Sequence, residues 1–218
     1  MLFHDSFLII EPQRGVKFML ALNTRVVQYD ILVSILPLSA DLFVFAYPIY
    51  LVGLYLWWIR KKTTFFKQAA LTIFSSAALT AGINMVIQYF YDKSRPESAI
   101  IDKANLILKH LPTDPFPSDH AAVSAAIAMA TMLRGLKYRD RRFLRTSLLF
   151  WIFCLIMSFS RVAVAIHRPT DILVGRGVGI GSALLVSHPT VQSFFSTKLF
   201  TPLIAFENKL TTLLFERK

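Results

Sequence analysis

Long apolar runs, separated by short polar segments that are mostly basic, make up most of this chain. Five of them are apolar enough to cross a membrane, which takes roughly 17–25 helical residues; they cover approximately residues 41–59, 68–90, 120–134, 147–166 and 171–187. The third run is short, but it is rich in Ala, and small side chains let helices pack closely in a bilayer. The pattern predicts a bundle of about five transmembrane helices.

Two further segments have weaker patterns. Residues 16–38 are interrupted by Arg25, Gln28 and Asp30, and residues 191–218 alternate apolar clusters with charged side chains. We interpret both as amphipathic helices in the membrane interface; a sixth transmembrane helix is the alternative for the first. The predicted fold class is all-α, a polytopic membrane helix bundle with interfacial N- and C-terminal helices. Residues 1–218 are expected to form a single integral-membrane domain.

Composition and charge support a membrane protein. Hydrophobic residues make up 55% of the 218 residues, and the mean hydropathy is +0.52, which is more apolar surface than a soluble domain of this size readily buries. The 24 Lys and Arg against 13 Asp and Glu give a net charge of +11. The only cysteine, Cys154, lies in an apolar run, so an internal disulfide or a zinc site built from several cysteines is excluded.

The basic residues gather in two loops, at 60–67 and 134–145. Loops of this kind between apolar runs are typical of anchoring beside anionic lipid, rather than of nucleic-acid binding. The positive-inside rule places both loops in the cytoplasm. Residues 91–119 and 161–171 then face outward together.

Three polar motifs lie at these outward helix ends: YDKSRPES (91–98), PSDH (117–120) and SRVAVAIHRPTD (160–171). Taken singly, each has a structural explanation. Arg95 can be an ordinary interface arginine, and Ser118 can cap the third helix. Asp171 can lie in the first turn of the fifth helix, where the helix dipole stabilises an acid.

Taken together, the motifs indicate chemistry. Arg161 lies near the end of an apolar run, where a helix has no local reason to hold a cation. The spacing lets Asp171 accept a hydrogen bond from one ring nitrogen of His167 while the other nitrogen faces outward, which is the arrangement of an activated nucleophile or base.

An anion site is predicted beside this histidine. Ser118 and the free amides of the third helix's N-terminus can bind an anion that Arg95 and Arg161 complete, and His120 faces the same position. Phosphoryl transfer needs positioning and charge stabilisation above all. Two guanidiniums can take over the role that metal ions have elsewhere, so we expect no metal.

The order Arg-Pro, Pro-Ser-x-His and Ser-Arg-x5-His-x3-Asp, over residues 88–171, resembles the type 2 phosphatidic acid phosphatase superfamily. The resemblance implies a metal-independent lipid phosphatase without a cofactor. His167 would attack phosphorus and form a phosphohistidine, Asp171 would orient its ring, and His120 would protonate the leaving oxygen and later help to activate water. Asp119 occupies a variable position of the motif. The residues expected to bind the phosphoryl oxygens are Arg95, Ser118 and Arg161.

One position departs from the family pattern. The family often has a Lys seven residues before the Arg of Arg-Pro, and this chain has Gln88 there; Lys93 is a candidate substitute. We include Gln88 and Asp119 among the candidate substrate-binding residues. Arg176, in the fifth run, either reaches outward to help bind a diphosphate or pairs with an acid inside the bundle.

The substrate is expected to be a membrane lipid that carries a phosphate or diphosphate. The small size, the missing Lys and DPFPSDHAA (114–122) are similar to bacterial undecaprenyl-diphosphatases. This implies conversion of undecaprenyl diphosphate to undecaprenyl phosphate for peptidoglycan synthesis, in a bacterial inner membrane with the site facing the periplasm or exterior. Phosphatidate, phosphatidylglycerophosphate and lipid A phosphate are alternative substrates.

Two other classes of protein also fit parts of the pattern. One is a catalytically inactive membrane scaffold, because of Gln88. The other is a vanadate-dependent haloperoxidase, which the five apolar runs disfavour because those enzymes are soluble. The expected partners are the lipid substrate and membrane lipids, with no nucleic acid, and the sequence makes no prediction of oligomeric state.

Overall fold

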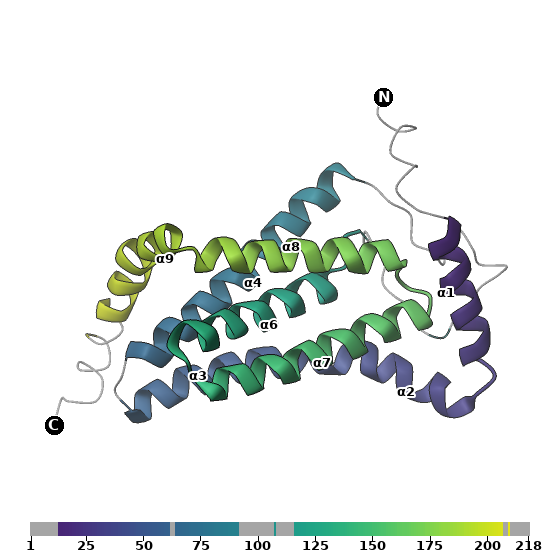
Figure 1. Cartoon of the computed structure of the whole chain (residues 1–218), viewed down its shortest axis with the longest axis horizontal. Helices are drawn as coiled ribbons and strands as arrows, with labels where there is room; N and C mark the ends of the chain where they lie inside the picture. The colour runs from purple at the N-terminus through teal and green to yellow at the C-terminus, as the bar shows by residue number, and fades with distance from the viewer. Residues whose placement is uncertain (1–12, 62–63, 92–106, 108–115, 207–208, 210–218) are drawn as a thin grey trace.

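The computed structural model describes residues 13–61, 64–91, 107, 116–206 and 209, and every regular element among them is helical. The predicted all-helical class is confirmed (Figure 1). In chain order the elements are α1 (Gln13–Val26), α2 (Asp30–Asp41), the short turn η2 (Leu42–Phe45), α3 (Ala46–Lys61), α4 (Thr64–Phe90), α6 (Asp119–Tyr138), α7 (Arg141–Ala163), α8 (Pro169–Ser187), α9 (Pro189–Phe195) and η3 (Ser196–Phe200).

Four stretches of helix are long and apolar enough to cross a membrane: Asp30–Trp57, Phe65–Phe90, Arg141–Ala163 and Pro169–Ser187. They overlap the predicted first, second, fourth and fifth runs. The predicted third run is α6, whose centre is built from Ala rather than larger apolar side chains. α6 packs against α4, α7 and α8. Because these neighbours surround it, α6 does not need the high hydropathy of a helix that faces lipid.

The predicted start of the first span, at residue 41, is wrong. The segment 16–38 is neither one interfacial helix nor a span of its own, because the helix breaks between Val26 and Asp30. α1 stands across the end of the bundle, whereas α2 continues through η2 into α3 as one span (Figure 1). An acid inside this span, Asp41, is tolerated because its carboxylate meets the guanidinium of Arg161.

Helices α6 and α8 approach each other closely because glycines of α8 face the backbone of α6. A Cβ at position 179 would lie 2.1 Å from the carbonyl oxygen of Ala122, and one at position 175 would lie 2.7 Å from that of Ser118. Only glycine fits at both positions without moving a helix. This contact fixes the start of α6 beside the start of α8.

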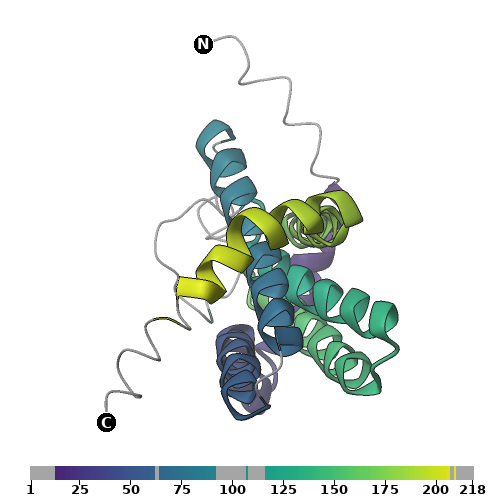
Figure 2. The ribbon, with the colours of Figure 1, turned by 90° about the vertical axis from the view of Figure 1, so that its left-hand side faces the viewer.

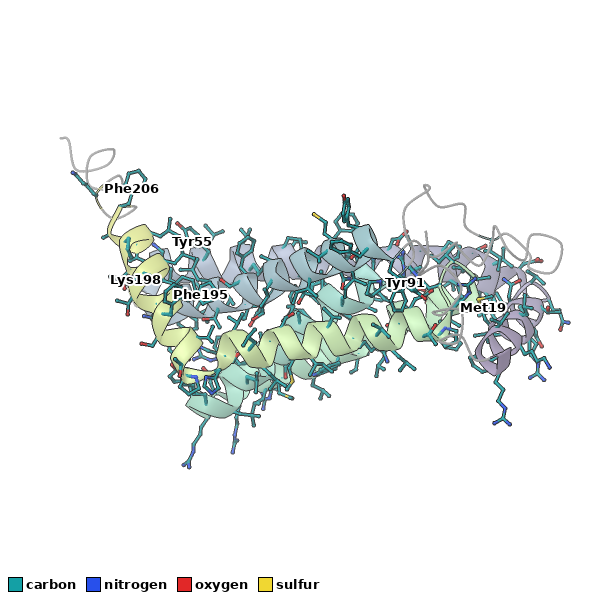
Figure 3. The ribbon with its side chains drawn as sticks, turned by 90° about the horizontal axis from the view of Figure 1, so that it is seen from above. Met19, Tyr55, Tyr91, Phe195, Lys198 and Phe206 are labelled. Carbon is teal, nitrogen blue, oxygen red and sulfur yellow. The ribbon has the colours of Figure 1, made fainter. Side chains whose placement is uncertain are left out.

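α1 covers the loop between α7 and α8. The Asn23 side-chain amide donates to the Ala163 carbonyl oxygen at 3.1 Å, and Met19 is fully buried. Figure 3 shows Met19 and Tyr91 at this end of the bundle, with Tyr55, Phe195 and Lys198 at the other. The apolar side chains that pack with Met19 are Ala121, Val162, Ala165 and Ile172.

Large apolar side chains point outward along the spans. Leu173 is 65% exposed, and Phe74, Val86, Leu155 and Leu184 are also exposed, as expected for helices that contact lipid. At the other end, α9 and η3 turn away from the bundle axis (Figures 1 and 2). Their exposed Phe194 and Leu199 agree with the predicted interfacial helix, of which the part beyond residue 206, except residue 209, lies outside the described residues.

Candidate active site

His167 lies in the tight connection between α7 and α8. Its backbone N–H donates to the Arg161 carbonyl oxygen at 3.3 Å, and the Ile166 N–H donates to the same oxygen at 3.2 Å. Ala165 has a φ of 63°, a left-handed conformation that costs a residue with a Cβ roughly 1–2 kcal/mol. His167 is 3% exposed. The connection therefore holds the imidazole in a defined, nearly buried place next to the end of α7.

Asp171 lies on the Nδ1 side of this ring; the spacing alone did not specify which nitrogen. Its Oδ2 is 3.7 Å from His167 Nδ1 and accepts a hydrogen bond from the Arg168 backbone N–H at 2.8 Å. The carboxylate is fully buried and is held by the capping box at the start of α8. A carboxylate fixed on the Nδ1 side leaves Nε2 as the nitrogen that can react.

Ser118 precedes α6 and is fully buried. Its backbone N–H donates to the Asp171 carbonyl oxygen at 3.1 Å, which ties the second motif to the third. The hydroxyl makes no capping hydrogen bond and has no hydrogen-bond partner within the described part of the chain. Helix capping therefore does not account for this side chain, and its hydroxyl is available for an anion.

Asp41 brings together two residues that the sequence assigned to the site. Its Oδ1 accepts a hydrogen bond from Arg161 Nη1 at 2.5 Å and lies 3.4 Å from His120 Nε2. Arg161 is 2% exposed, and its Nη1 also donates to the Ala40 carbonyl oxygen at 3.2 Å. One carboxylate oxygen thus contacts both the guanidinium and the imidazole, which is the position expected for a phosphoryl oxygen.

Asp41 was not among the predicted site residues. The signal that could have found it is an acid within an apolar run, because ionisable groups at membrane depth usually have a partner or a function. It is 41% exposed, so the carboxylate is reachable by water on one side.

Asp119 and Gln88 pair with each other. The Gln88 amide donates to both carboxylate oxygens of Asp119 and to the Pro117 carbonyl oxygen, each at 3.3 Å. Asn84 donates to Asp119 Oδ1 at 2.8 Å. The position where the family often has a Lys therefore holds an amide that bonds to the carboxylate next to His120.

The remaining predicted residues lie elsewhere. Arg95 and Lys93 lie outside the described residues. Arg176 Nη2 donates to the Cys154 carbonyl oxygen at 3.5 Å, so its described contact is to the backbone of α7 rather than to an acid. Among the described residues, no group of three or more His, Cys, Asp or Glu is placed to hold a metal ion.

The arrangement can bind an anion and act on it with two imidazoles. Arg161 supplies positive charge, and Ser118 supplies a hydroxyl without a described partner. His120 contacts the same Asp41 oxygen as Arg161, and the backbone of His167 is bonded to the Arg161 carbonyl.

Comparisons with known proteins identify the family of the chain. The family model of the PAP2 superfamily matches residues 69–194, more than half of the chain. A comparison with curated protein sequences gave no significant match. The fold is similar to the crystal structure of a transmembrane PAP2 type phosphatidylglycerolphosphate phosphatase from Bacillus subtilis, with a TM-score of 0.59 at 18% identity over 82% of this chain and 87% of that chain. The chain therefore belongs to the PAP2 superfamily.

Proposed function

We propose that this protein is a membrane phosphatase that removes phosphate from a lipid through a phosphohistidine on His167. The observation that carries the proposal is the placement of a nearly buried His167, with Asp171 on its Nδ1 side, next to the Arg161 whose guanidinium meets an anionic oxygen beside His120.

The reaction would proceed in two displacements. His167 Nε2 attacks the terminal phosphorus and the bond from that phosphorus to the oxygen of the leaving lipid alcohol or lipid phosphate breaks, while His120 gives that oxygen a proton. Arg161 and the Ser118 hydroxyl hold the phosphoryl oxygens, together with Arg95 on the family resemblance. Water then attacks the phosphohistidine, His120 accepts the water's proton, and the N–P bond breaks to release phosphate. Asp171 holds the ring and stabilises its positive charge in the intermediate.

Substrate binding would require Asp41 to move. Its Oδ1 occupies the position between Arg161 and His120 that a phosphoryl oxygen must take. The carboxylate is partly exposed and lies where α2 gives way to η2, so a side-chain rotation can release the guanidinium to the substrate.

The proposed substrate is undecaprenyl diphosphate, the lipid that the sequence favours. Exposed apolar side chains surround the bundle, which supports a substrate whose tail stays in the bilayer. The end opposite the site carries exposed Arg139, Arg141 and Arg145, which supports an outward-facing site in a bacterial inner membrane.

Phosphatidylglycerophosphate is a second candidate, favoured by Asp119. This exposed carboxylate is adjacent in the chain to His120, the residue proposed to protonate the leaving group. It can accept hydrogen bonds from hydroxyl groups, and it repels a second phosphate joined directly to the first.

The test is a phosphate-release panel with the purified protein in detergent. Undecaprenyl diphosphate, phosphatidylglycerophosphate and phosphatidate are compared for the unmodified chain and for His167→Ala. His188→Ala is the matched control, because His188 precedes α9 at the other end of the bundle and its side chain makes no capping hydrogen bond there. We expect release that is lost in His167→Ala and kept in His188→Ala. Absence of His167-dependent release from all three lipids would support an inactive scaffold instead.

A further inference from the structure

A cavity lies at the end of the bundle opposite the candidate active site. It has a volume of about 410 Å³ and is bounded by residues of α4, α6, α8 and α9. Arg134 and Lys137 of α6 line it, and no acidic residue does so among the residues that the structure describes. The other polar residues of its wall are Thr72, Ser187 and Gln192.

Arg134 is a buried cation with unused donors. It is 4% exposed, its Nη2 donates to the Phe65 carbonyl oxygen at 2.9 Å, and its Cζ lies 4.7 Å and 4.4 Å from the ring centroids of Phe65 and Tyr138. Nε and Nη1 have no hydrogen-bond partner within the described part of the chain. A buried guanidinium is costly unless oxygen acceptors complete it. An anion with several oxygens supplies what this site lacks.

Lys137 adds a second positive charge on the same wall. Its Nζ donates to the side-chain oxygen of Gln192, in α9, at 2.6 Å. A neutral amide fixes the position of the ammonium without cancelling its charge. Arg134 and Lys137 are three residues apart in α6, so they lie on one face of the helix.

The surroundings favour a lipid over a soluble anion. The rest of the α6 wall is apolar, with Ala130, Leu133 and Leu136. Beyond Gln192, α9 and η3 expose Phe194 and Leu199. A ligand that reaches both cations would therefore also lie along apolar side chains. This end carries the basic loops that the positive-inside rule assigns to the cytoplasm, where anionic lipids are enriched.

We propose that this cavity binds the headgroup phosphate of an anionic phospholipid from the cytoplasmic leaflet. Arg134 and Lys137 hold the phosphate, and an acyl chain lies against the apolar face of α6 and α9. The lipid is a ligand here and not a substrate, because its phosphodiester lies at the end of the bundle away from His167.

The test uses the full chain, purified in detergent and titrated with phosphatidylserine or, in parallel, phosphatidylcholine. Bound lipid is counted by native mass spectrometry, and the thermal unfolding midpoint is followed. Phosphatidylserine should be retained and should raise the midpoint more than phosphatidylcholine does. Lys137→Gln should weaken phosphatidylserine binding about fivefold, the effect of one positive charge near a lipid phosphate, and Lys137→Glu should abolish it.

Arg145→Gln is the matched control, because Arg145 is exposed at the same end but does not line the cavity. It should leave phosphatidylserine binding unchanged. Equal losses in Lys137→Gln and Arg145→Gln would reduce the effect to general surface charge and overturn the proposal. So would displacement of the lipid by free glycerophosphate at matched concentration, since that outcome identifies a soluble-anion site. Lys137 variants avoid the folding defect that replacement of the buried Arg134 can cause.

Discussion

Replacing Asp41 with Asn should make the active site bind anions more tightly. The carboxylate is the internal competitor for Arg161, with Oδ1 2.5 Å from Nη1 and 3.4 Å from His120 Nε2. Asn keeps an oxygen that can accept from Arg161 and removes the negative charge. A bound phosphate then no longer has to displace a charged group from the guanidinium.

The size of the effect follows from exposure. A hydrogen bond to a charged group contributes about 1.5–3 kcal/mol, whereas exposed ion pairs contribute about 0.2–1 kcal/mol. Arg161 is buried and Asp41 is 41% exposed. The free energy needed to displace the Asp41 carboxylate from Arg161 is therefore about 1–2 kcal/mol, between these two ranges. That corresponds to about 5–30-fold in affinity.

The assay is inhibition of phosphate release by orthovanadate, which resembles five-coordinate phosphorus. The inhibition constant of Asp41→Asn should fall about 5–30-fold relative to the unmodified chain, and KM should fall in the same direction. Asp30→Asn is the control, because Asp30 lies in the first turn of the same helix, far along it from Arg161. It should leave both constants unchanged.

An unchanged or weaker affinity for vanadate in Asp41→Asn, with Asp30→Asn normal and the protein folded, would refute this reasoning. Asp41 would then be a structural partner of Arg161 rather than a group that the substrate displaces.

Three further outcomes are expected. Phosphate release should persist in excess chelator, because the proposed site holds the anion with basic side chains rather than with a metal; loss that added metal restores would contradict this. Gly179→Ala should lower the thermal unfolding midpoint, because its Cβ would overlap the Ala122 carbonyl oxygen; overpacking of this kind lowers the free energy of unfolding by about 1–3 kcal/mol. Gly177→Ala is the control and should leave the midpoint unchanged, because a Cβ there has nothing within 4 Å. Asp140→Ala should cost about 0.5–2 kcal/mol by removing the N-cap of α7. The bonds from Arg142 hold the pKa of Asp140 below its ordinary value, so this contribution is full at neutral pH and is lost as the pH falls through that lowered pKa; unfolding measured against pH tests it.

The apolar pattern was enough to predict the helical class and the approximate position of the spans, because lipid-facing helices must be continuously apolar. It misplaced the start of the first span. Arg25, Gln28 and Asp30 interrupted the apolar pattern, so residues 16–38 resembled an interfacial segment rather than the start of a span. The compensation for Asp41, the acid inside this span, comes from Arg161, 120 residues further on, and no local pattern contains it.

Only the part of the candidate site that consists of motif residues could be predicted from the sequence. The spacing of His167 and Asp171 predicted a carboxylate close to one ring nitrogen, and in the structure Asp171 Oδ2 lies 3.7 Å from His167 Nδ1, which is longer than a hydrogen bond. The pairing of Gln88 with Asp119 was not predictable, because it joins two helices whose register depends on packing. The same holds for Asp41.

The glycines of α8 have a consequence for how a substrate can enter. Because they lock this helix against α6, and the Ser118 amide is bonded to the Asp171 carbonyl, this half of the site is a stiff wall. We therefore expect any opening on the opposite side, where the first span carries Asp41 and its α-helix is interrupted by the 3-10 turn η2. On this basis, the substrate should enter from the bilayer beside the first span. A cross-link between that span and α7 should slow substrate entry, whereas a cross-link between α6 and α8 should not.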